Sequence, residues 1–271
     1  MNVFTKLKKY LIKLSLKVEK RVRFVLSAVI MCSLIVFASL FEFNMFWVFI
    51  PVFVLSTYIL TYFSVLEGIE GAELLMLFLM PVLFTVSFYL FYFLFPIRWL
   101  TRVPFIVLYG ISIYAILLTS NIFNVGVEKN LQLQRAAFAV NYFFQSLLVF
   151  LLANVLFSFK QNAFINGGVM FVAVLPLALQ LLWTVKLNKK LERKLLSYSF
   201  LIALMIGQST ILMSFVPLKS TILALFVTAL YYSLGGIIYH FIDDRLFKNV
   251  VREYMLVLGF VSILVLLSVS W

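Results

Sequence analysis

Nine apolar runs, each long enough to cross a bilayer, occupy most of this chain, and none carries Asp, Glu, Lys or Arg near its middle. A spanning helix needs about 20 apolar residues, whereas a membrane β-strand needs about 10 with alternating faces. The runs have the greater length and are apolar on all sides, so they predict helices. The predicted spans are residues 24–41, 45–64, 74–95, 105–124, 136–157, 164–185, 199–216, 221–242 and 254–271. We therefore expect an all-α polytopic transmembrane helical bundle of about nine spans.

The composition excludes a soluble protein of this size. Hydrophobic residues make up 65% of the chain, charged residues only 12%, and the mean hydropathy is +1.12. A soluble domain cannot hide that much apolar surface. The single cysteine, Cys32, lies in the first run, so neither an intramolecular disulfide nor a thiolate metal cluster is expected. We expect no cofactor.

The absence of charge in the middle of the runs also bears on function. A charge at mid-bilayer costs roughly 2.5–3.5 kcal/mol, and proteins that keep one use it for ion coupling or proton relay. A proton-driven pump is therefore not expected. One histidine rules out an H-E-x-x-H metalloprotease helix, and no G-x-S-x-G or P-loop pattern occurs. No established catalytic motif is present, which argues against an enzyme.

The distribution of basic residues predicts the orientation. With the N-terminus in the cytoplasm, the external loops hold only four of the 22 Lys and Arg residues: Arg98, Arg102, Lys160 and Lys219. The connection over residues 65–73 gives this rule no support, because it carries three glutamates and no basic residue. We predict a protein of the cytoplasmic membrane with its N-terminus inside and its C-terminus outside.

Residues 1–22 predict a separate element. Leu7, Leu11, Leu14 and Val18 recur at helical spacing, and lysines fill the other faces. This pattern is typical of an amphipathic helix that lies in the membrane interface and binds anionic lipids at the cytoplasmic face. Topology explains most of the net charge of +12, and no binding motif accompanies it, so no nucleic-acid partner is expected. Residues 23–271 are expected to form a single transmembrane helical domain.

Amide side chains provide the first candidate site. A polar intramembrane face is predicted from six residues: Asn121, Asn124, Asn141, Gln145, Gln180 and Gln208. Asn141 and Gln145 are four residues apart and therefore share one helical face. Amides in hydrocarbon seek partners on other helices, at about 0.6–2 kcal/mol per bond. Two interpretations stay open at this point: the amides hold helices together, or they line a polar pocket that opens to the cytoplasm.

Small residues and prolines indicate how the helices pack and end. Ser199, Ala203 and Gly207 recur every four residues and predict a seam of close helix packing. Pro96 and Pro104 are expected to separate the third and fourth spans. Three further prolines fall inside runs: Pro51, Pro81 and Pro176. There they are expected to kink helices.

The end of the eighth run provides a second candidate, a headgroup or metal site of His240, Asp243, Asp244 and Arg245. If the helix continues, His240 and Asp244 stand at i and i+4, and Asp243 at i+3, so an imidazole and two carboxylates converge. Such a group can hold a divalent cation that bridges to phosphate. The alternative is a hydrogen-bonded pair at a charged helix end.

One stretch carries a resemblance. It runs from Asn121 to Phe138 and includes Gln132, Arg135, Ala136 and Ala137. It resembles an uncharacterised family of bacterial multi-pass membrane proteins, over spans four to eight. This resemblance implies no known activity, and it implies a bacterial cytoplasmic membrane.

Three functions are compatible with these observations. The first is a structural or interaction subunit of a membrane assembly, with a protein partner or a second copy of the chain. The second is a passage protein for a neutral or lipid-like solute, which would use the amide-lined region. The third is an enzyme that acts on phosphate-headed lipid at His240, Asp243 and Asp244.

Overall fold

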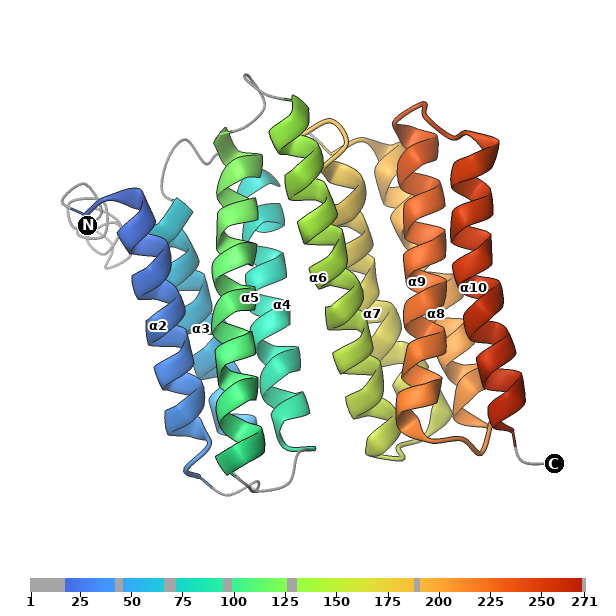
Figure 1. Ribbon diagram of the computed structural model, residues 1–271, viewed down its shortest axis with the longest axis horizontal. Helices are drawn as coiled ribbons and strands as arrows, with labels where there is room; N and C mark the ends of the chain where they lie inside the picture. Colours follow the sequence, from blue (N-terminus) through green and yellow to red (C-terminus); the bar gives the residue numbers. More distant parts are fainter. Residues whose placement is uncertain are drawn as a thin grey trace. The chain divides into compact units, whose positions relative to one another are not determined.

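The computed structural model describes residues 18–41, 46–65, 72–94, 99–125, 131–187 and 191–269, and these residues form helices and no strand. The helices are α2 (Lys20–Ala38), α3 (Phe46–Val65), α4 (Ala72–Tyr92), α5 (Trp99–Val125), α6 (Leu131–Ser158), α7 (Ala163–Trp183), α8 (Arg193–Ser214), α9 (Ser220–Ile242) and α10 (Lys248–Ser268) (Figure 1). All nine of these described helices are long and apolar enough to cross a membrane. The predicted all-α, multi-pass membrane fold is confirmed. The predicted amphipathic helix of residues 1–22 falls largely outside the described residues, which begin at residue 18.

The expected role of Pro104 is wrong. We placed it in the connection before the fourth span, but α5 begins at Trp99 and includes Pro104 in its second turn. Pro104 is the sixth residue of α5, so the carbonyl of Leu100, four residues earlier, lacks its usual helical donor. Pro51 lies similarly early in α3, whereas Pro81 and Pro176 lie deeper in α4 and α7, as expected.

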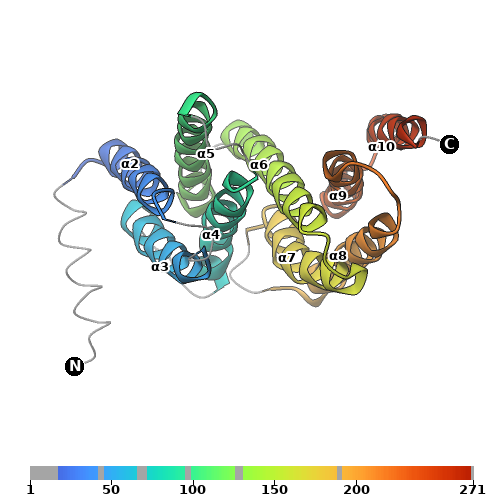
Figure 2. The ribbon, with the colours of Figure 1, turned by 90° about the horizontal axis from the view of Figure 1, so that it is seen from below.

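The helices group into two compact units, Met1–Asn141 (unit 1) and Tyr142–Trp271 (unit 2), and the boundary falls within α6. In unit 1, α2 and α4 each pack against both α3 and α5, and Figure 2 shows α2 beside α3. Aromatic rings fill the space between α4 and α5, where the centroids of Phe88 and Phe105 lie 3.9 Å apart. The single transmembrane domain expected from residue 23 onward stays a prediction.

In unit 2, the closest helix pair is α7 and α8, which lie side by side (Figure 2). A Cβ atom placed on Gly167 would lie 2.8 Å from the carbonyl oxygen of Gly207, so the two backbones approach as closely as glycine allows. Ser199, Ala203 and Gly207 are all buried. The predicted seam of small residues is therefore where α8 meets α7. Helix α9 packs against α7, α8 and α10.

Candidate functional site

A buried hydrogen-bond network in unit 2 centres on Gln145 of α6. Its Nε2 donates to Oε1 of Gln180 in α7 at 2.5 Å and to the carbonyl oxygen of Leu177 at 3.3 Å. Its Oε1 accepts a bond from the hydroxyl of Tyr231 in α9 at 2.7 Å. Gln145, Gln180 and Tyr231 are all buried. One side chain thus joins three helices inside the bilayer, where each bond replaces an unsatisfied polar group in hydrocarbon.

A ladder of tyrosines continues from this network toward the C-terminal end of α9. The hydroxyl of Tyr142 donates to the carbonyl oxygen of Tyr232, and their rings stack with centroids 5.1 Å apart. The Tyr232 ring in turn lies 5.2 Å from the ring of Tyr254 in α10. Gly236 makes room for Tyr254, because a Cβ there would overlap the tyrosine ring. The Ser233 hydroxyl donates to the backbone carbonyl of Tyr254 at 3.0 Å, which fixes α10 on α9.

Asn141 stands one helical turn before Gln145 and is also buried, with 1% of its surface exposed. Its Nδ2 makes no hydrogen bond within the described part of the chain. Asn141 and Gln145 are therefore both buried, but they differ in their hydrogen bonds. Gln145 uses both the oxygen and the nitrogen of its amide, whereas the nitrogen of Asn141 is unpaired among the described residues. For the predicted set of six amides, both interpretations, helix packing and a polar pocket, stay predictions.

Two further predicted amides, Asn121 and Asn124, lie in α5 of unit 1. The Nδ2 of Asn124 donates to the carbonyl oxygen of Val65 at 3.4 Å. The guanidinium of Arg23 donates to the carbonyl oxygen of Phe63 at 3.4 Å, and Ser27 donates to that of Leu60. The last carbonyl groups of a helix lack helical donors, and a cation there also matches the helix dipole. Asn124 and Arg23 therefore close the C-terminal end of α3, and Ser27 contacts the same helix about one turn earlier.

The continuing helix that the His240 site requires is not present, and the headgroup or metal site itself stays a prediction. Helix α9 ends at Ile242, and Asp244 has a φ of 56°, in the left-handed region, so His240 and Asp244 do not stand at i and i+4 of one helix. Asp243 instead forms a salt bridge with Arg245 at 3.5 Å. Among the described residues, no three His, Cys, Asp or Glu side chains are grouped so that they could hold a metal ion. The Nδ1 of His240 is buried and has no partner there.

Gln208 differs from the other five predicted amides because it lies on the exposed face of α8. Its neighbours on that face are apolar: Leu204 is 40% exposed, Met205 38% and Leu212 66%. These four residues are referred to below as the α8 face. Within unit 2, the structure thus brings Gln145 and Gln180 together, whereas Gln208 lies apart from them on the exposed face of α8.

The part of the chain that holds this network matches a known protein family. The model of one family, described as a protein of unknown function (DUF5656), matches residues 106–268. The chain belongs to this family. The DUF5656 match includes all of α6 to α10, and therefore both the Gln145 network and the tyrosine ladder. No curated protein matches the chain, and no solved structure does. The resemblance to an uncharacterised family is confirmed, and its bacterial origin stays a prediction.

Sequence reasoning missed two kinds of residue. Arg23 was counted only as a basic residue that orients the chain, although Ser27 follows it at i+4 and indicates a shared polar face. Tyr142, Tyr231 and Tyr232 are not singled out by the sequence analysis, because tyrosine is counted there among the hydrophobic residues. A signal was present: a tyrosine hydroxyl far from the ends of a spanning helix needs a buried acceptor.

Proposed function

We propose that this DUF5656 protein is an interaction subunit of a membrane assembly, and that the α8 face docks a transmembrane helix of another protein or of a second copy. The single observation that carries the proposal is the exposed amide of Gln208 on an otherwise apolar face. Gln208 lies 15 residues after Arg193, about 22 Å along the helix axis, and about 9 Å before the end of α8. A hydrocarbon core of about 30 Å encloses that position.

An amide that faces lipid is costly to leave unpaired. In lipid, the donors and acceptor of Gln208 have no water to bond to, so leaving them unpaired costs free energy. A helix that packs on the α8 face and presents a hydroxyl or amide removes this cost. Such interhelical bonds are worth about 0.6 kcal/mol on average and up to about 1.7 kcal/mol. Leu204 and Leu212, one turn to either side, supply the surrounding van der Waals contact.

The hydrogen bonds of Gln145 support an interaction protein over a passage protein. Gln145 uses its carbonyl oxygen for Tyr231 and its amino group for Gln180 and Leu177. An amide that lines a solute path must leave donors or acceptors available to the solute. At Gln145 the amide donor and acceptor are instead bonded to residues of α7 and α9, so they join these helices to α6.

A photocrosslinking experiment in native membranes tests the proposal. A benzoylphenylalanine placed at position 208 is expected to form an adduct with a membrane protein or a second copy, identified by mass spectrometry. Val172 of α7, 68% exposed, is the control position, where lipid adducts are expected. Gln208→Leu is expected to reduce recovery of that partner from native membranes, whereas Gln132→Leu, at the exposed start of α6, is not. Lipid adducts alone at position 208 contradict the proposal.

A further inference from the structure

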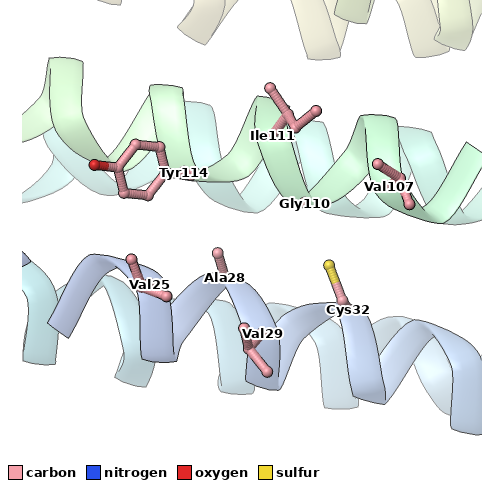
Figure 3. Close-up of a pocket in the computed structure, with 8 residues that line it drawn as sticks. All are labelled: Val25, Ala28, Val29, Cys32, Val107, Gly110, Ile111 and Tyr114. Carbon is pink, nitrogen blue, oxygen red and sulfur yellow. The ribbon is translucent and has the colours of Figure 1, made fainter. Parts of the chain in front are cut away.

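An open groove of about 440 Å³ runs between α2 and α5 of unit 1. Figure 3 shows its two walls: Val25, Ala28 and Cys32 come from α2, and Val107, Gly110 and Tyr114 from α5. Gly110 forms the floor, because a Cβ atom there would lie 2.8 Å from the Cys32 sulfur. The walls are exposed, with Val25 at 49% and Val107 at 54%. The surface inside the groove is almost entirely apolar.

The groove covers the depth of one leaflet. Along α2 it extends from Val25 to Cys32, seven residues or about 10 Å. It begins about 7 Å from Lys20, the first residue of α2, and ends about 18 Å from it. Half of a hydrocarbon core of about 30 Å is about 15 Å. A docked transmembrane helix would need a groove along the whole length of α2, whereas an acyl chain of one leaflet needs only this depth.

A basic residue stands just beyond one end of the groove, and a tyrosine hydroxyl lies at that end. Arg21 precedes Val25 by four residues, so Arg21, Val25, Ala28 and Cys32 form one stripe along α2, and Arg21 is exposed. Tyr114 brings a phenol hydroxyl to the same end (Figure 3). Glu19 is also exposed, but it stands two residues from Arg21 and so faces another side of the helix. Along its length the site presents a cation, then a hydroxyl, then only apolar surface.

This order matches an anionic phospholipid, whose phosphate, ester groups and acyl chain follow in the same sequence. We propose that the groove between α2 and α5 holds an acyl chain of an anionic phospholipid from the leaflet at the Lys20 end, with the phosphate at Arg21. The proposal concerns unit 1 and is independent of the α8 face in unit 2.

The test uses the full chain in phosphatidylcholine vesicles with a trace of phosphatidylglycerol that carries a photoactivatable acyl chain. Adducts mapped by mass spectrometry are expected at residues 25–32 and 107–114. Phosphatidylcholine with the same chain is expected to label these residues about five-fold less, the factor for about 1 kcal/mol per basic residue near an anionic headgroup. Equal labelling by the two lipids, or labelling spread evenly over α2, α3 and α5, overturns the proposal.

Two variants separate the headgroup from the chain. Arg21→Gln is expected to lower labelling by phosphatidylglycerol to the level seen with phosphatidylcholine. Arg193 is an exposed arginine at the start of α8, and Arg193→Gln is expected to leave labelling by both lipids unchanged. Val107→Trp fills the groove and is expected to reduce labelling by both lipids, whereas Val172→Trp on α7 does not. Arg21 is exposed and supports no core contact, so Arg21→Gln tests the proposal even if the tryptophan variant fails to fold. Undiminished phosphatidylglycerol labelling in Arg21→Gln overturns it.

Discussion

The hydroxyl of Ser120 in α5 donates to the carbonyl oxygen of Leu77 in α4, at 3.3 Å, and both residues are buried. Leu77 stands four residues before Pro81, so this carbonyl is the one that the proline leaves without a helical donor. Thr85, one turn further on, donates to the carbonyl oxygen of Pro81 at 2.8 Å. A helix–helix bond thus satisfies a backbone group that a soluble protein would give to water.

We expect Ser120→Ala to lower the free energy of unfolding by about 0.6 kcal/mol, because the Leu77 carbonyl then has no donor in hydrocarbon. Denaturant titration in mixed micelles measures this value. Ser112→Ala is the matched control, since Ser112 bonds to the Leu108 carbonyl of its own helix and, among the described residues, to no other helix. An equal loss in the two variants would show that Ser120 contributes nothing between helices.

Gln145→Leu is expected to cost more, about 1–3 kcal/mol of unfolding free energy, because it leaves the hydroxyl of Tyr231 buried without its acceptor. Tyr231→Phe removes the same bond from the other side. A double-mutant cycle should therefore show coupling, with the double variant less destabilised than the two single losses added together. Strict additivity would mean that the two side chains do not interact in the membrane.

Helix number and length could be predicted because the bilayer imposes one requirement, that about 20 apolar residues cross it in helical form. The side of the helix on which a single amide lies could not. Gln180 and Gln208 each interrupt an apolar run, yet Gln180 is buried beside Gln145 and Gln208 is exposed. In a soluble helix the polar face marks the outside, whereas in lipid both the inside and the outside are apolar, so the periodicity that assigns faces is lost.

The two neighbouring glycines of α7 give a sharp test of helix packing. Gly167→Ala is expected to lower the free energy of unfolding by about 1–3 kcal/mol, because its methyl group would clash with the Gly207 backbone and the Ile211 side chain. Gly168→Ala meets nothing within 4 Å, so it should leave stability unchanged or raise it by up to about 1 kcal/mol. Similar losses in both variants would indicate a helix-wide effect instead of contact with α8.

The candidate site was harder to predict than the fold, because it depends on where helices end. The convergence of His240 and Asp244 required α9 to continue, but the chain turns after Ile242, and Arg245 N–H donates to the His240 carbonyl at 2.9 Å. No residue in this stretch is a glycine or proline that would announce the turn. The burial of Arg23 could not be predicted from the sequence either, since a basic residue at the start of a span is usually placed in the membrane interface.

The orientation inferred from basic residues can be tested at two exposed connections. In a Cys32→Ser background, a cysteine at Lys160, between α6 and α7, is expected to react with a membrane-impermeant maleimide on intact cells. A cysteine at Lys248, at the start of α10, is expected to react only after the membrane is permeabilised. The reason is the positive-inside rule, since the connections assigned to the outside carry only four basic residues, Lys160 among them. Labelling of position 248 from outside, with position 160 protected, would invert the orientation and move the Arg21 end of the lipid groove to the outer leaflet.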